Sequence, residues 1–226
     1  YYPYALFQAG LTAFYYGDLP QARTYFLSLI SEKEIPGELK ERAYLNLLDL
    51  AERREDWEEV IAFADLLLPY TESVTREEIL TRKTIAQALQ EKSLHWEGEL
   101  YKKIQTLKEL QGKGEEIRRD LLPRLFIALG DLYFFSAKNL FLSPDDPAVG
   151  EILEIKARWL LKSQDQYLRS IWFLDPLYGT KAIFRIGYLY ESFYEEVIAL
   201  PPPKNLSSQE IEIYRGEVYR LLEPLR

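Results

Sequence analysis

Residues 124–135 read RLFIALGDLYFF, and Leu129-Gly130-Asp131-Leu132-Tyr133 at the centre of this stretch indicates a helix that packs closely on another helix. A glycine inside a helix costs about 0.5–1 kcal/mol relative to alanine, so it needs a packing reason. An aliphatic residue and a glycine, followed three positions later by tyrosine, recur at Ile186-Gly187 and Tyr190, and Ala9-Gly10 holds the matching place near the amino terminus. We therefore predict that Gly10, Gly130 and Gly187 each lie at a close contact between helices.

The rest of the chain has the same helical character. Apolar residues recur three and four positions apart, and no stretch alternates strictly enough to predict a strand. Turn residues separate the helical runs, so we expect about ten helices, mostly of about 14 to 28 residues, joined by loops of about 2 to 7 residues. Because short loops make consecutive helices pack antiparallel, the sequence predicts an all-α fold made of helical hairpins.

Capping and turn residues predict where some helices begin and end. Thr75 with Glu78, and Ser207 with Glu210, have the spacing of a capping box at a helix start. The segment 112–114, Gly-Lys-Gly, predicts a stop. We expect one domain over residues 1–226, and a subdivision, if there is one, near residues 112–114.

Residues of the first hairpin carry a repeat pattern. Gly17-Asp18 marks a turn, and Ala22 and Phe26 lie one turn apart on the next helix, facing back onto the first. Together with Gly10 this set resembles the tetratricopeptide repeat, and the segments around Gly130 and Gly187 match the same pattern. The resemblance covers most of the chain and implies an α-solenoid of about five degenerate hairpins, right-handed as in that family.

The carboxy-terminal third resembles a narrower group. Residues 182–191, AIFRIGYLYE, lead into Pro201-Pro202-Pro203 and then into Tyr214-Arg215. This order is similar to the late segment of long tetratricopeptide proteins from Gram-negative bacteria, of the kind associated with gliding motility and the outer membrane. The resemblance implies a periplasmic or outer-membrane-associated protein, and a cytoplasmic location is the alternative.

Composition narrows the classes of partner. The formal net charge is -8, which disfavours binding to nucleic acid because that binding relies on Lys and Arg. Cys is absent, so disulfides, cysteine metal sites and thiol catalysis are excluded. The chain starts at Tyr1 and contains no Met, so we expect the native amino terminus to lie upstream. No apolar run reaches the roughly 18 to 20 residues of a membrane span, and the sequence does not predict the oligomeric state.

Candidate catalytic and metal-binding residues are few. His95 is the only histidine, and no nucleophile or orienting acid follows it at a suggestive spacing. Pairs such as Glu58-Glu59 and Glu195-Glu196 are neighbours on one helix, and their side chains diverge instead of converging. We therefore expect no enzyme activity, no cofactor and no metal.

The tetratricopeptide resemblance also implies which side chains face a partner. In that fold the first helix of each repeat lines the concave face at set positions. Carried onto this chain, these positions are Tyr4, Phe7, Phe14, Tyr15, Arg124, Asp131, Phe134, Lys181, Tyr188 and Glu191, with Leu11, Ile127, Phe135, Phe184 and Ser192 adjoining them. Aromatic anchors with interspersed charges suit a groove that holds a peptide, but the same rings could also pack between neighbouring helices.

The function implied by these patterns is a scaffold or adaptor that binds another protein or a peptide through its helical-repeat surface, within a bacterial envelope assembly. The alternative is a helical protein that binds or cleaves glycans with its tyrosine-rich face. The chain has 17 tyrosines, which would supply that face. Two carboxylates about 5 to 10 Å apart in a deep cleft would favour the glycan enzyme, and an open groove would favour the scaffold.

Overall fold

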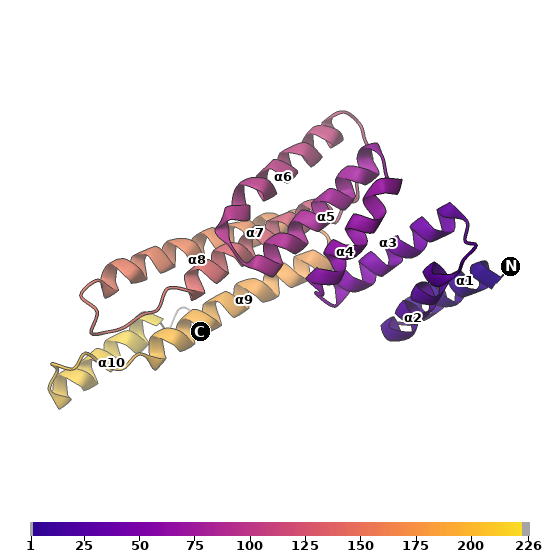
Figure 1. Cartoon of the computed structure of the whole chain (residues 1–226). Coiled ribbons are helices and arrows are strands. Elements are labelled where there is room, and N and C mark those ends of the chain that lie inside the picture. Colours follow the sequence, from indigo (N-terminus) through magenta and orange to yellow (C-terminus); the bar gives the residue numbers. More distant parts are fainter. Residues whose placement is uncertain (1, 223–226) are drawn as a thin grey trace. The chain divides into compact units, whose positions relative to one another are not determined.

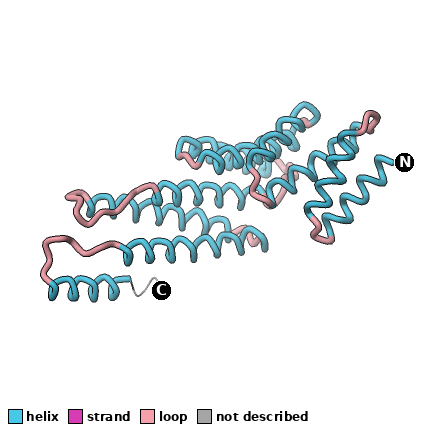
Figure 2. The backbone as a smooth tube through the Cα atoms, turned by 60° about the horizontal axis from the view of Figure 1, so that its bottom comes forward, coloured by secondary structure: helices cyan, strands magenta, loops and turns pink. Residues whose placement is uncertain are grey.

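The computed structural model describes residues 2–222, and within this range the chain is helical with no strand (Figures 1 and 2). The prediction of an all-α fold is confirmed. The α-helices are α1 (Tyr2–Tyr15), α2 (Leu19–Ser31), α3 (Gly37–Arg53), α4 (Trp57–Leu67), α5 (Ser73–Glu91), α6 (Glu97–Gly112), α7 (Leu121–Lys138), α8 (Val149–Ile171), α9 (Pro176–Ala199) and α10 (Ser208–Leu222). Two 3₁₀ turns, η1 (Leu68–Tyr70) and η2 (Leu94–Trp96), complete the described secondary structure.

Local chemistry explains several of the helix ends. Gly17 turns the chain after α1 with a φ of 83°, a conformation that glycine adopts without strain. The Asp18 carboxylate then caps α2 by accepting a hydrogen bond from the backbone N–H of Gln21, at 3.1 Å. At the start of α10, the Ser207 backbone N–H donates to the Glu210 carboxylate at 2.8 Å, so the capping box predicted there is confirmed.

Two expectations about helix ends are wrong. Thr75 and Glu78 do not open a helix, because α5 begins earlier, at Ser73, and Glu78 instead accepts a hydrogen bond from the backbone N–H of Arg118 at 2.6 Å. Three connections are longer than expected, at residues 113–120, 139–148 and 200–207. Each of the last two contains prolines, which keep a segment extended without continuing a helix.

The helices form two compact units. Unit 1 contains residues 1–91 and 106–118, and unit 2 contains residues 92–105 and 119–226. The division falls inside α6, whose residues 97–105 belong to unit 2 and whose later residues belong to unit 1. The expectation of a single domain stays a prediction, because two compact units can still unfold together.

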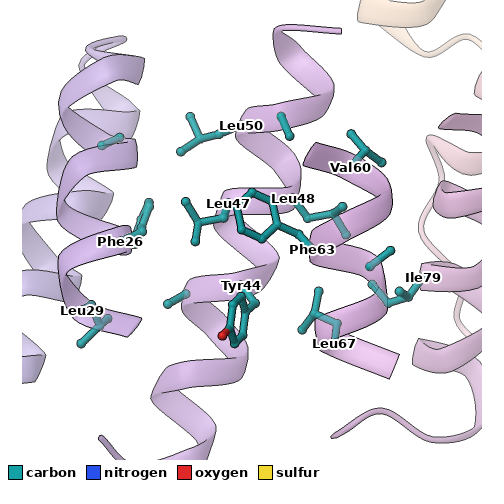
Figure 3. Packing of buried hydrophobic residues seen from close by; sticks show 14 of the residues in the cluster. Phe26, Leu29, Tyr44, Leu47, Leu48, Leu50, Val60, Phe63, Leu67 and Ile79 are labelled. Carbon is teal, nitrogen blue, oxygen red and sulfur yellow. The ribbon is translucent and has the colours of Figure 1, made fainter. Parts of the chain in front are cut away.

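In unit 1, each of the helices α1 to α4 packs on the next, and α1 also contacts α3. The buried side chains come from successive helices, among them Phe26 of α2, Leu47 and Leu48 of α3, and Phe63 of α4 (Figure 3). Gly10 of α1 faces the ring of Phe26, and a Cβ placed on Gly10 would lie 2.6 Å from that ring. The close contact predicted for Gly10 is therefore confirmed.

An ion cluster joins α3 to α5 within unit 1. The guanidinium of Arg82 is almost completely buried and donates two hydrogen bonds to the Glu52 carboxylate, at 2.8 and 2.6 Å. A third bond goes to Asp49, which also accepts from Arg118 at 3.2 Å. The planar guanidinium suits this arrangement because its donors are fixed in a fork.

Unit 2 is built around α7, whose residues 121–134 are all buried. Such a helix is apolar on nearly every side, as the sequence of 124–135 indicates. Gly130 lets α8 approach, since a Cβ there would lie 2.4 Å from the ring of Tyr167, and this close contact is also confirmed. The hydroxyl of Ser163, also on α8, donates to the backbone carbonyl of Gly130 at 2.8 Å and fixes the contact.

Candidate functional site

The residues predicted to face a partner separate into three sets, and the first set lies on α1. Phe7 is buried, with the guanidinium of Arg42 over its ring at 4.8 Å, and Phe14 is half-buried, with that of Arg53 over its ring at 4.5 Å. Tyr15 is exposed and so is Tyr4 at the other end of the helix. The rings of Phe7 and Phe14 therefore join α1 to α3, and only the two tyrosines face solvent.

The second set lies on α7 and is buried in the core of unit 2. Asp131 accepts a hydrogen bond from the hydroxyl of Tyr167 at 2.7 Å and pairs with Arg185 of α9, whose Nε lies 3.2 Å away. Burial and then the charge of Asp131 raise the pKa of Tyr167, so its hydroxyl keeps the proton that it donates. These contacts hold α7, α8 and α9 together.

The other α7 residues of this set are equally covered. Phe134 packs on Tyr188 with ring centroids 5.6 Å apart. Arg124 is buried, pairs with Asp120 at 3.3 Å and lies over the ring of Tyr178 at 5.7 Å. Arg124, Asp131 and Phe134 are therefore part of the core and offer no open surface. Of the two alternatives that the sequence left open, a peptide groove or packing between helices, these three residues fit the packing.

The third set, Lys181, Tyr188 and Glu191, lies on α9 at the margin of its exposed side, where the Tyr188 ring also packs on Phe134 of α7. With three neighbours these residues form a continuous row, which we call the α9 stripe: Leu177, Lys181, Phe184, Tyr188, Glu191 and Glu195. Successive members are four, three, four, three and four positions apart, so they occupy one side of the helix. Leu177 is 64 % exposed, Phe184 is 67 % exposed and Tyr188 is 43 % exposed. The stripe is thus apolar over much of its length and acidic at its carboxy-terminal end.

Gly187 borders the α9 stripe, and here the sequence prediction is wrong. Gly187 is exposed, and no described atom beyond its own helix lies within 4 Å of a Cβ placed on it. The physical reason is the position of α10. Tyr214 and Tyr219 of α10 line a hollow with residues 197–202, at the end of α9, instead of covering its middle. The helix that follows α9 therefore supplies no ring to Gly187.

Contacts on the side of α9 that faces α7 and α8 fix which residues point outward. Ala182 and Leu189 are buried there. The Lys138 ammonium of α7 donates to the Ser192 hydroxyl at 2.7 Å, and the buried Lys156 of α8 donates to the Glu196 carboxylate at 2.5 Å. With the pair between Arg185 and Asp131, these contacts prevent α9 from rotating, so the exposed stripe is a preorganised surface.

The start of α9 is also well defined. The Asp175 carboxylate accepts hydrogen bonds from the backbone N–H groups of Leu177 and Tyr178, at 3.0 and 2.9 Å. Pro176 occupies the first turn, where no backbone donor is needed. Leu174, just before it, has a φ of 54°, which is rare for a branched side chain and completes a sharp turn after α8. The stripe begins directly after this turn.

Residues of α9 also line an open hollow of about 600 Å³, and tyrosines and glutamates, which the glycan alternative requires, are among them. Its described lining residues are Phe184, Gly187, Tyr188, Tyr190, Glu191, Tyr194 and Glu195. All of them belong to one helix, and Glu191 and Glu195 are one turn apart on it. Neighbours at that spacing lie on the same face of a helix.

Other candidate chemistry is sparse in residues 2–222. His95 is exposed in η2 and its Nδ1 lies 2.8 Å from the Ser93 hydroxyl. Within the described range no group of three or more His, Asp or Glu side chains is arranged to hold a metal ion. None of the described helices combines the length and the apolarity that crossing a bilayer requires.

Chelation is expected to leave the melting temperature unchanged. A structural metal contributes folding free energy directly, so its removal lowers stability, and the described acidic side chains form no cluster that could bind one. Thermal unfolding followed by circular dichroism, with and without EDTA, checks this expectation. A clear drop in the melting temperature on adding EDTA, reversed by a divalent cation, would contradict it.

Comparison with known proteins gives no match to this chain among protein-family models, curated proteins or solved structures.

Leu177 and Glu195 are the stripe residues that sequence reasoning missed. Their signal is present in the sequence, because the alternation of four and three positions from residue 177 to residue 195 is a heptad-like spacing. The repeat register pointed only to the middle of this row. The sequence pattern does not indicate where α10 lies, and therefore does not indicate that Leu177, Phe184 and Glu195 stay exposed.

Proposed function

We propose that this protein is a non-catalytic, tetratricopeptide-like helical scaffold that binds another protein through the α9 stripe. The observation that carries the proposal is a row of about five helical turns with exposed Leu177, Phe184 and Tyr188 among charged residues. Large apolar side chains standing together on a surface mark interaction sites, whereas single exposed apolar residues need no explanation.

The stripe has the composition that interfaces favour. Phe184 and Tyr188 supply rigid aromatic area at the centre, and aromatic residues dominate binding energy where they become fully desolvated. Lys181 and Glu191 lie on either side and would set the register and orientation of a partner. Because α9 is already held by contacts to α7 and α8, little conformational entropy is lost when a partner binds.

Packing within the units supports the repeat class. Consecutive helices contact one another from α1 to α5 in unit 1 and from α7 to α10 in unit 2, as hairpins in series would. Gly10 and Gly130 each receive an aromatic ring from the following helix, from Phe26 and Tyr167. The proposed place in a bacterial envelope assembly rests on the sequence resemblance of the carboxy-terminal third alone.

A glycan-binding role is the second candidate, and one observation favours it. Tyr188, Tyr190 and Tyr194 gather with Glu191 and Glu195 around the hollow on α9, and aromatic rings with carboxylates also suit sugars. The described walls come from a single helix, so a bound sugar would remain largely in water. This arrangement favours a protein partner, which can bring its own walls to the site.

Replacing Phe184 with glutamate is expected to abolish the capture of partners from an extract of the native host. The substitution places a charge at the apolar centre of the stripe, where a partner must exclude water. Immobilised wild-type protein and variant are compared by mass spectrometry of the retained proteins, after circular dichroism has shown equal helix content.

Phe141→Glu is the matched control, because Phe141 is 86 % exposed in the segment 139–148 and is not a member of the stripe. Proteins retained by the wild type and by Phe141→Glu, but lost from Phe184→Glu, are the expected result. Equal retention by all three chains would reject the α9 stripe as the binding surface. Retention of glycans instead of proteins, lost in the same variant, would favour the second candidate.

A further inference from the structure

The α9 stripe is complementary to itself when two copies run antiparallel. When two helices with this heptad-like spacing pack antiparallel, each stripe position of one helix faces a stripe position of the other across the interface. If the twofold axis crosses the seam at the level of residue 186 along α9, residue i of one copy lies opposite residue 372 − i of the other. Lys181 then faces Glu191 of the second copy, and Phe184 faces Tyr188. Each contact occurs twice, as a symmetric interface requires.

This register uses each exposed feature of the stripe. The two pairs of Phe184 with Tyr188 form an aromatic centre, where offset or edge-to-face rings are favourable. The two pairs of Lys181 with Glu191 flank it on both sides. Leu177 comes to lie beside the aliphatic part of Glu195, and the Glu195 carboxylate can reach back towards Lys181.

Gly187 lies on the flank of the α9 stripe, next to the centre of the pair. It lies one residue from the proposed axis and no described atom beyond its own helix comes within 4 Å of a Cβ placed on it. Gly10 and Gly130 each accept an aromatic ring from a second helix inside the chain, at Phe26 and Tyr167. A glycine inside a helix needs a packing reason, and the isolated chain gives none for Gly187. A second copy packed beside it would provide that reason.

We infer that the partner of the α9 stripe is a second copy of this chain, packed antiparallel about a twofold axis next to Gly187. The inference rests on the proposed function, since it names the partner of the same surface. A parallel pairing is disfavoured because it would place Lys181 against Lys181 and Glu191 against Glu191, which repel.

A charge exchange tests the register. Sedimentation velocity across the micromolar range should show a monomer–dimer equilibrium for the wild type. Lys181→Glu alone, and Glu191→Lys alone, should each raise the dissociation constant about tenfold, because each places two like-charged pairs in the interface. The double variant Lys181→Glu/Glu191→Lys should restore dimerisation to within about threefold of the wild type. Because Lys181 also interacts within its own chain, Glu191→Lys is the cleaner single variant.

Lys33→Glu and Glu34→Lys are the matched controls, since both residues are exposed in the turn after α2 and the net charge changes by the same amount. Neither should change the dissociation constant. Failure of the double variant to recover, or equal weakening by the controls, would overturn the register. A wild-type chain that stays monomeric throughout would overturn the inference, while the capture experiment with Phe184→Glu would still decide the proposed function.

A distance measurement tests the antiparallel orientation independently. The chain has no cysteine, so a nitroxide attached to Ala199→Cys reports a single intermolecular distance. Ala199 is the last residue of α9 and lies beyond the stripe, and two antiparallel copies would separate these positions by roughly 40 Å. A parallel pair would place the labels at about the interaxial distance of 8 to 10 Å. Pulsed electron resonance near the longer distance supports the inference, and the short distance contradicts it.

Discussion

Replacing Gly130 with leucine is expected to destabilise the protein by about 3 kcal/mol, at the upper end of the usual cost of overpacking. A Cβ on Gly130 would lie 2.4 and 2.6 Å from two atoms of the Tyr167 ring, so even the first added carbon overlaps the ring. The ring has no room to move, because Tyr167 is buried and its hydroxyl is bonded to Asp131. Chemical denaturation followed by circular dichroism gives the free energy of unfolding of both chains.

Gly187→Ala is the matched control, and we expect the opposite sign. Gly187 occupies the same place in the sequence pattern as Gly130 but meets no neighbouring helix in the described structure. Alanine there should stabilise the chain by about 0.5–1 kcal/mol, because an exposed helix position loses less backbone entropy with alanine. Gly130→Leu as stable as the wild type would show that Tyr167 can move away, and the tight contact between α7 and α8 would then be wrong. Measurements at low protein concentration keep any self-association out of the comparison.

The contrast between these glycines shows what sequence reasoning could reach. The pattern of an aliphatic residue, glycine and tyrosine correctly predicts the close contacts of Gly10 and Gly130, because a helix-interior glycine needs a reason. The pattern fails at Gly187, because a close contact also needs a second helix that packs there, and the local sequence does not show whether one does. The sequence of α9 does not indicate that α10 packs against residues 197–202 and leaves the middle of the helix uncovered.

The candidate site shows the same limit. Arg124 and Asp131 look like groove residues because charged side chains are rare in a core, and the repeat register places them on one face. The structure buries both, and Asp131 is compatible with burial because Tyr167 and Arg185 satisfy it. These partners lie 36 and 54 positions further along the chain. Pairings over that separation are tertiary information, which one sequence without relatives does not reveal.

The apolar residues around Arg124 and Asp131 already indicate that this helix is buried. In residues 124–135 almost all of the remaining side chains are apolar, so the helix has no broad polar face to present to solvent. A helix of this composition belongs in the interior. The α9 segment differs in that Lys181, Glu191 and Glu195 share one side with Phe184 and Tyr188. That mixture of charge and aromatic area is typical of interfaces, and the structure leaves this side exposed.

Replacing Arg82 with methionine is expected to destabilise the protein by about 3 kcal/mol, the lower end of the cost of breaking a buried ion pair. Arg82 is 1 % exposed and forms two hydrogen bonds to Glu52 and one to Asp49, so its loss removes the fork that joins α5 to α3. The Glu52 carboxylate, 9 % exposed, would lose both hydrogen bonds from Arg82. Asp49 would keep Arg118, and this remaining pair is the reason for the lower end of the range.

Three further variants separate charge, geometry and packing at this cluster. Arg158→Met should cost no more than about 0.5 kcal/mol, because Arg158 pairs with Glu154 in solvent, where ion pairs contribute little. Arg82→Lys should remain clearly destabilising, since an ammonium keeps the charge but cannot reproduce the planar fork. Arg82→Met/Glu52→Leu should recover part of the stability, because it removes the buried carboxylate together with the cation that it pairs with. If Arg82→Met is as mild as Arg158→Met, water reaches Glu52 in solution and the pair between α3 and α5 does not hold unit 1 together.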